Sequence, residues 1–158
     1  MFTEPDSAQG RPAAASPFRR LLVAWDGSPD SVAALRTAAA VVGSAPGHIV
    51  AFAVLPEGVQ PEAEPDDAGA GSESGRRAAE AFEFARAAIE RDPGVRMTLH
   101  SEPGRHVARS VCDYASEHGF DLLVVGRHGE GGILHPRLGH IAEAAARNSK
   151  IPVLLVSA

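Results

Sequence analysis

The chain has 158 residues, of which 15 are basic and 20 acidic, and its formal net charge is −5. This length favours one domain that buries roughly 70% of its unfolded surface, and the acidic balance disfavours a protein that coats nucleic acid. The single cysteine, Cys112, excludes an internal disulfide or a zinc site built of several thiolates. The longest apolar run, 49–55, is far shorter than the ~20 residues that cross a bilayer, and the N-terminus lacks a secretion pattern. We therefore expect a cytoplasmic protein with no membrane or nucleic-acid partner.

Two segments lack the hydrophobic periodicity of packed structure. Residues 1–17 are rich in alanine and proline, which predicts a disordered tail. Residues 56–75 carry six acidic residues and no basic one among glycines and prolines, which predicts a flexible, solvated acidic loop. The remaining chain is slightly positive, and we expect one domain over residues 18–158.

Short apolar runs alternate with helical patterns along this domain. The run 21–25 is too short for a helix and is typical of a strand buried on both faces. Ser28 then predicts a helix N-cap, Pro29 the first helical residue and Gly43 the helix end. The later predicted elements are a strand at 48–55, a helix patterned on Ala78, Phe82, Ala85 and Ile89, an edge strand in which Val95, Met97 and Leu99 alternate with polar residues, a helix patterned on Val107, Val111 and Ala115 and ended by His118 and Gly119, a strand at 121–126, a helix at 138–149 and a strand at 152–156.

Strands separated by helices predict an α/β domain, with a doubly wound parallel sheet and helices on both faces. Ligands of such sheets bind beyond the carboxyl ends of the strands, where the winding direction switches. The loops that follow Trp25 and Val125 are therefore the candidate site.

Both loops have unusual residue choices. The segment 126–139 has five glycines in fourteen residues and leads into a helix. Glycines let the backbone approach a ligand, and the free amides and dipole of a helix start favour an anion such as phosphate. Arg127 and Arg137 can add charge-assisted hydrogen bonds, and Asp26 is an acceptor that suits sugar hydroxyls or a base amino group. Together these residues suggest a nucleoside phosphate.

Four segments resemble the universal stress protein family in order and spacing. They are residues 23–28, residues 121–126, the pattern Gly126-x2-Gly129-x9-Gly139, and residues 152–156. The resemblance covers about residues 18–158, and the combination is far more specific than the glycine spacing alone.

The resemblance implies a five-stranded sheet of order 3-2-1-4-5 that forms a homodimer through its last strand. It implies a nucleotide-binding stress-response regulator with ATP or another adenine nucleotide, with or without Mg. In this family the strand-one aspartate and strand two hold the adenosine, while the glycine motif holds the phosphates. Carried over, the resemblance implies binding residues Asp26, Gly27, Ser28, Val54, Gly126, Arg127, Gly129, Arg137, Gly139, His140 and Ile141.

One position departs from the family pattern. The last motif glycine is usually followed by serine or threonine, whose hydroxyl contacts phosphate, whereas this chain has His140. The backbone amide of His140 can still donate, but its imidazole is larger. Glu130 also adds an anion to a loop expected to bind one. A diphosphate, a monophosphate, a cyclic nucleotide or no nucleotide therefore stay open.

The same residues also have simpler structural roles open to them. Asp26 and Ser28 can serve only as caps, the glycines only as turns, and the arginines only as solvated charges. His128, His135 and His140 are seven and five residues apart, which is not the spacing that aligns metal ligands on a helix, so no metal site is expected. The buried apolar surroundings expected for Cys112 predict packing without chemistry.

Two nucleotide-binding motifs and one related fold are excluded. The chain has neither the dinucleotide fingerprint after its first strand nor a P-loop, and its single lysine, Lys150, lies at the wrong end of a sheet for a phosphorelay receiver. The alternatives to a nucleotide-binding regulator are a nucleotide-free dimeric partner protein and a slow ATP hydrolase. A paired base and orienting residue is not visible in the sequence, so no catalytic residue is assigned.

Overall fold

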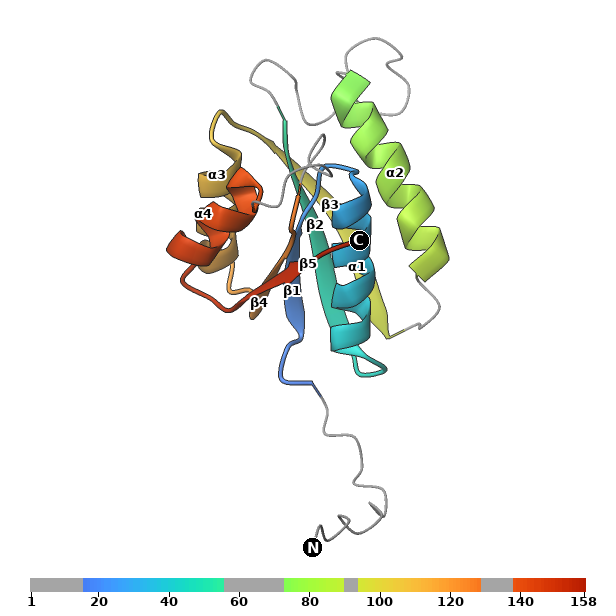
Figure 1. The fold of residues 1–158 in the computed structure, drawn as a ribbon. Coiled ribbons are helices and arrows are strands. Elements are labelled where there is room, and N and C mark those ends of the chain that lie inside the picture. Colours follow the sequence, from blue (N-terminus) through green and yellow to red (C-terminus); the bar gives the residue numbers. More distant parts are fainter. Residues whose placement is uncertain (1–15, 56–72, 90–93, 129–137) are drawn as a thin grey trace, which may run out of the picture.

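The computed structural model describes residues 16–55, 73–89, 94–128 and 138–158 (Figure 1). Residues 1–15 of the predicted tail and residues 56–72 of the predicted acidic loop lie outside these ranges, as do Gly129 and Arg137. In chain order the elements are β1 (Arg20–Ala24), α1 (Pro29–Val42), β2 (Gly47–Leu55), α2 (Glu73–Ile89), β3 (Val95–Pro103), α3 (Val107–Glu117), β4 (Leu122–Gly126), α4 (His140–Asn148) and β5 (Val153–Val156).

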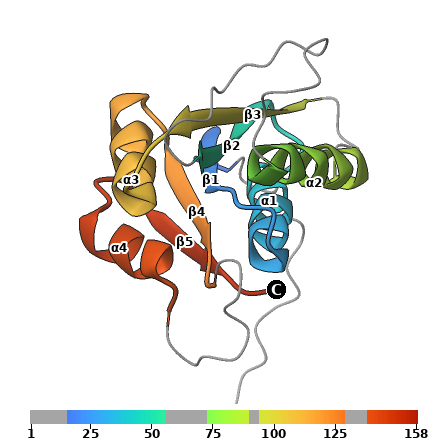
Figure 2. The ribbon, with the colours of Figure 1, turned by 90° about the horizontal axis from the view of Figure 1, so that it is seen from above.

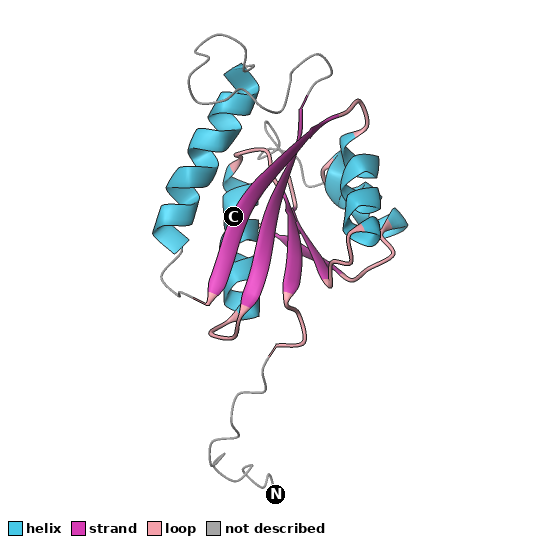
Figure 3. Ribbon diagram, turned by 180° about the vertical axis from the view of Figure 1, so that it is seen from behind, coloured by secondary structure: helices cyan, strands magenta, loops and turns pink. Residues whose placement is uncertain are grey.

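The strands form one five-stranded sheet of order β3-β2-β1-β4-β5, in which every neighbouring pair is parallel (Figure 3). This confirms the predicted fold class and strand order. Seen from above, α1 and α2 cover one face of the sheet, and α3 and α4 cover the other (Figure 2). Both faces are covered because the connections that build β2 and β3 on one side of β1 cross one face of the sheet, whereas those that build β4 and β5 on its other side cross the opposite face.

Each face of the sheet has its own core. On the α1 and α2 face, Leu21 and Val23 of β1 pack with Leu35 of α1 and Phe82 of α2. On the opposite face, strand residues such as Leu22 and Leu123 pack with α3 and α4. Successive strand residues thus alternate between two buried faces, which explains why the central strands are apolar without interruption.

The start and end of α1 follow the predicted local chemistry. Ser28 is the N-cap, its Oγ accepts a hydrogen bond from the Ser31 amide at 3.2 Å, and Pro29 is the first helical residue. At the other end, Gly43 has φ of 66°, a left-handed conformation that glycine adopts without a steric penalty.

Two helix starts and the burial of one residue differ from the sequence predictions. Helix α2 begins at Glu73, so residues 73–75, which the sequence placed in the acidic loop, are helical. Helix α4 begins at His140 instead of residue 138, because Gly139 has the extended backbone of an N-cap, with φ of −63° and ψ of 158°. Val107, predicted to share the apolar stripe of α3, is 36% exposed, whereas Val111 and Ala115 are buried as predicted.

The predicted edge position of β3 is confirmed. Val95 and Met97 are buried, and Arg96 and Thr98, which point to the other face, are exposed. The end of the sheet opposite to the carboxyl edge is closed by Asp121, whose Oδ2 accepts from the amides of Arg19 and Arg20 at 2.9 Å each. This carboxylate joins the entry of β1 to the entry of β4.

Trp25 connects the sheet to α2. Its side chain is buried, its Nε1 donates to the carbonyl oxygen of Ala78 at 2.9 Å, and its ring meets the ring of Phe82 edge-on at 5.8 Å. Trp25 directly precedes Asp26, so the residue that anchors α2 is adjacent in sequence to the first residue of the candidate site. Within the described ranges, none of the helices is both long and apolar enough to span a bilayer.

Candidate functional site

The turns after β1 and β4 leave the sheet at the same edge. Residues 26–28 follow β1 and lead into α1, and residues 127 and 128 follow Gly126, the last residue of β4. These two strands are neighbours in the sheet, yet the helices that follow them, α1 and α4, lie on opposite faces (Figure 2). The carboxyl ends of β1 and β4 are therefore the switch point at which ligands of doubly wound sheets bind.

The first turn is held by its own polar groups. Oδ1 of Asp26 accepts from the Ser28 amide at 2.9 Å, and Gly27 has φ of 78°, which a side chain would strain. The Ser28 hydroxyl caps α1, and its backbone carbonyl accepts from the hydroxyl of Ser31 at 2.9 Å. Ser28 is buried, and its observed contacts are those of a helix cap. Asp26 lies just beyond the carboxyl end of β1.

Val54 lies level with this turn. Ala24 of β1 is in register with Phe52 of β2, and β2 continues to Leu55, so Val54 stands beside the turn begun by Asp26. Its side chain is partly buried against the core under α3. The structure thus brings Asp26 and Val54, the two residues expected to hold an adenosine, to neighbouring positions.

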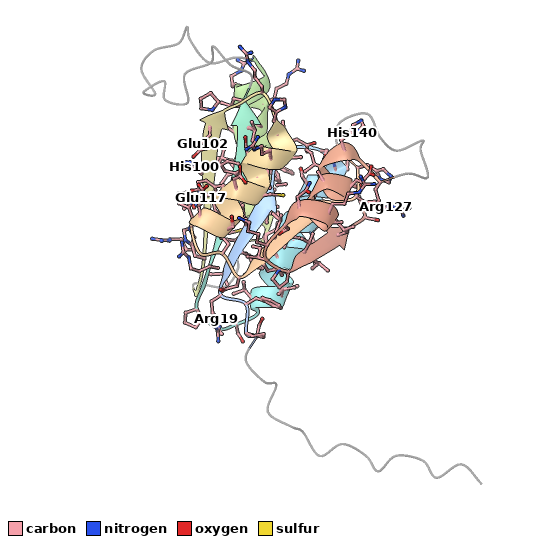
Figure 4. The ribbon with its side chains drawn as sticks, turned by 90° about the vertical axis from the view of Figure 1, so that its left-hand side faces the viewer. Arg19, His100, Glu102, Glu117, Arg127 and His140 are labelled. Atoms are coloured by element: carbon pink, nitrogen blue, oxygen red, sulfur yellow. The ribbon has the colours of Figure 1, made fainter. Side chains whose placement is uncertain are left out.

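The second turn is joined to α4 and β5 by backbone hydrogen bonds. The Arg127 amide donates to the carbonyl of Val156 at 2.7 Å, and the Arg127 carbonyl accepts from the Gly139 amide at 2.9 Å. Figure 4 shows Arg127 and His140 on the same side of the molecule, next to the start of α4. Because the Gly139 amide is already bonded to Arg127, the amides that open toward a ligand here are those of the first helical residues, His140 and Ile141.

The start of α4 is suited to an anion. Gly139 provides no side chain to cap the helix, and among the described residues no other side chain caps it. The first amides of a helix have no partner inside the helix, and together with the helix dipole they attract a negative group. Gly129 and Arg137, the other predicted phosphate contacts, lie outside the described residues.

Gly126 packs closely against Asp30, a residue that the sequence did not indicate as part of the site. A Cβ at Gly126 would lie 2.8 Å from the Cβ of Asp30, so glycine lets the end of β4 pass against the first turn of α1. Asp30 is 9% exposed, and its carboxylate accepts from the amides of His128 at 2.9 Å and Ala158 at 2.8 Å. The Nδ1 of His128 also lies 3.2 Å from Oδ2 of Asp30.

The charge of Asp30 is favoured by these donors. Burial raises the pKa of the Asp30 carboxyl, but the amides of Ala158 and His128 and the His128 imidazole outweigh it, so the pKa lies below its usual value of 3.8. In sequence, an acidic residue in the first turn of a helix indicates only a favourable dipole contact. Its position directly beside the candidate loops was the one available signal.

Two further predicted features are placed by the structure. Cys112 is buried in the core under α3, as predicted, and burial raises the pKa of its thiol. In the part of the chain that the structure describes, His, Cys, Asp and Glu side chains nowhere form a group of three that could hold a metal ion.

The fold and the two turns define a doubly wound α/β domain with an anion-suited helix start at its switch point. The sequence model of the universal stress protein family matches residues 17–157. The chain therefore belongs to the universal stress protein family, which confirms the resemblance inferred from its motifs.

Solved structures with the same fold span nearly the whole chain. Universal stress protein UspA from Lactobacillus plantarum aligns with a TM-score of 0.70 at 17% identity, over 88% of this chain and 97% of its own. A universal stress protein in complex with cAMP aligns with a TM-score of 0.57 at 25% identity, over 89% of this chain and 97% of its own. The universal stress protein from Archaeoglobus fulgidus in complex with dAMP aligns with a TM-score of 0.57 at 19% identity, over 89% and 98%. No curated protein sequence matches this chain.

Proposed function

We propose that the chain binds an adenine nucleotide, with ATP as the first candidate and Mg as its companion ion, at the carboxyl edge of β1 and β4. The observation that carries this proposal is the start of α4. There the helix begins without a side-chain cap among the described residues, directly beside Arg127 and at the switch point of the sheet. A phosphate would satisfy the unpaired amides and the helix dipole together.

The two turns divide the work of binding. On the β1 side, the Asp26 carboxylate accepts from hydroxyl or amino groups of the adenosine, with Gly27 allowing close approach and Val54 beside it. On the β4 side, the amides of His140 and Ile141 and the guanidinium of Arg127 meet the phosphates. Gly126 and Gly139 keep the backbone open at this end, and Ser28 holds the first turn in place. Gly129 completes the glycine motif in sequence, and Arg137 can add a second charge-assisted hydrogen bond to the phosphates.

The relatives support an adenine nucleotide as ligand. A family member with 25% identity is described in complex with cAMP, and an archaeal one with dAMP. Both ligands carry an adenine base and one phosphate. They support the base and sugar end of the proposed site more directly than a triphosphate end, where this chain has His140 in place of the usual hydroxyl residue.

We further propose that the protein acts as a cytoplasmic, homodimeric regulator that joins its partner through β5. This strand is the sheet edge opposite to β3, and its residues Val153, Leu154 and Val156 are only partly buried, with Leu155 37% exposed. A second copy would cover this apolar edge. Bound nucleotide shifts such an assembly only by binding one of its states more tightly than the other.

The test is calorimetric titration of the purified protein with Mg-ATP, AMP, cAMP and adenosine, together with analysis of the denatured protein for co-purified nucleotide. Asp26→Ala should weaken nucleotide binding by ~1–3 kcal/mol, because it leaves a hydrogen-bonding group of the ligand without a partner. The matched control is Asp113→Ala, which removes an exposed carboxylate of α3 that lies 3.5 Å from Nε of Arg109 and is not among the residues proposed to bind the nucleotide. Flat titrations with every nucleotide, with none released on denaturation, would instead favour a nucleotide-free dimer.

A further inference from the structure

The carboxylate of Asp30 joins three parts of the chain that are distant in sequence. Asp30 is the second residue of α1. Its two carboxylate oxygens accept hydrogen bonds from His128 and Ala158, which lie 98 and 128 positions later in the sequence. The amide of His128, just after β4, donates to Oδ2, and the amide of Ala158, just after β5, donates to Oδ1. One buried side chain therefore holds the exits of β4 and β5 against the start of α1.

A chain of backbone hydrogen bonds extends this connection to α4. The carbonyl of Val156 at the end of β5 accepts from the Arg127 amide, and the carbonyl of Arg127 accepts from Gly139, the N-cap of α4. Arg127 and the first amides of α4 are the groups assigned to phosphate in the proposed function. Their places thus depend on how the exits of β4 and β5 are held.

The contacts of Asp30 require a carboxylate. Three N–H groups converge on it: the amides of Ala158 and His128, and Nδ1 of His128, which must carry the hydrogen because an ionised carboxylate only accepts. Asparagine has the same shape, but its amino group would face one of these donors and lose that hydrogen bond. The absence of a side chain at Gly126 is what lets Asp30 come this close.

We propose that Asp30 is a positioning residue of the nucleotide site, which fixes Arg127 and the start of α4 for phosphate by holding the exits of β4 and β5 together. This inference rests on the proposed function. Asp30 itself does not touch the ligand. Its effect is therefore specific to the phosphate end of the nucleotide, whereas the adenosine end depends on Asp26 and Val54.

The first experiment compares Asp30→Asn with the control Asp113→Asn in calorimetric titrations with ATP, AMP and adenosine. Asp30→Asn should lower the affinity for ATP and AMP by roughly 3- to 30-fold, the size of effect expected of a residue that modulates a site without contacting its ligand. Adenosine affinity should stay within about twofold of the wild type. An equal loss for all three ligands would mean that the substitution only loosens the fold, and would overturn the positioning role.

A second pair of variants removes one hydrogen bond and leaves Asp30 in place, so the test does not depend on the folding of Asp30→Asn. Proline lacks an N–H, so Ala158→Pro deletes the donor to Oδ1, while Ala158→Gly keeps it. Ala158→Pro should lower the affinity for ATP by roughly 2- to 10-fold, and Ala158→Gly should leave this affinity unchanged. If the wild type binds ATP and both Asp30→Asn and Ala158→Pro bind it equally well, only the positioning role fails. If the wild type binds none of the three ligands, the proposed function fails and this inference fails with it.

Discussion

Gly126 lies directly against Asp30, with the position of a Cβ at residue 126 only 2.8 Å from the Asp30 Cβ and 2.9 Å from its carbonyl carbon. Backbone on both sides of this contact leaves no flexible side chain to move away. The close approach fixes α1 relative to the end of β4, and it brings the Asp30 carboxylate within reach of the amides beyond that strand.

Substitution of this glycine tests the close approach. Gly126→Ala should lower the free energy of unfolding by about 1–3 kcal/mol, because the added methyl forces a backbone shift of α1 or β4. Chemical denaturation followed by circular dichroism measures it. The control is Ala40→Ser, which adds one atom on the exposed side of α1 and should change stability by less than about 0.5 kcal/mol. Equal stabilities for the wild type and Gly126→Ala would show that the contact relaxes freely.

The carboxylate of Asp121 supports the opposite end of the sheet. Asp121→Ala removes the acceptor of the Arg19 and Arg20 amides, and should lower the free energy of unfolding by about 1.5–3 kcal/mol, the range for hydrogen bonds to charged groups. Nucleotide affinity should not change, since these residues lie at the far end of β1 from Asp26. A loss of affinity without a loss of stability would contradict this division between the two ends of the sheet.

The lowered pKa of Asp30 predicts a dependence of stability on pH. A carboxyl whose folded pKa lies below its unfolded value of 3.8 binds fewer protons in the folded state. It therefore contributes stability that is fully present above the unfolded pKa and is lost as the pH falls through the folded pKa. The stability difference between the wild type and Asp30→Asn should be constant at neutral pH and shrink below about pH 4. Denaturant unfolding across this range measures it, and a difference that does not change down to acid unfolding would assign the effect of Asp30 to shape alone.

His140 is the position at which the chain departs from the usual family pattern. His140→Ser should raise the affinity for ATP relative to AMP, because the substitution removes the bulk of the imidazole and supplies a hydroxyl at the start of α4. Parallel titrations of the two nucleotides measure the ratio. The control His118→Ser changes a histidine at the far end of α3 and should leave the ratio unchanged. An unaltered ratio in His140→Ser would mean that its side chain does not face the phosphates.

Local sequence rules were sufficient for most of the fold. Ser28, Pro29 and Gly43 act through their immediate neighbours, so the limits of α1 could be read directly, and the spacing of Ala78, Phe82 and Ala85 gave the buried face of α2. Val107 shows where this reasoning fails. It has the right spacing for the stripe of α3, but its side chain is 36% exposed, because burial depends on which neighbouring elements pack against a position and not on spacing alone.

The site was predicted less completely than the fold. The sequence indicated the turns after β1 and β4, because the carboxyl ends of parallel strands meet at one edge. It did not indicate that the Gly139 amide is bonded to Arg127, or that Asp30 collects donors from His128 and Ala158. Those contacts join residues that are far apart in sequence, and neither periodicity nor residue type reports them.

The hydrogen bond between Trp25 and Ala78 gives the chain a built-in optical reporter. Trp25 is its single tryptophan, and the indole is shielded from water by the helix that it anchors. If α2 were to detach while the sheet stayed folded, the emission would shift to the red before the far-ultraviolet signal of the whole domain was lost. Comparison of the two signals during unfolding thus distinguishes departure of this one helix from collapse of the entire molecule.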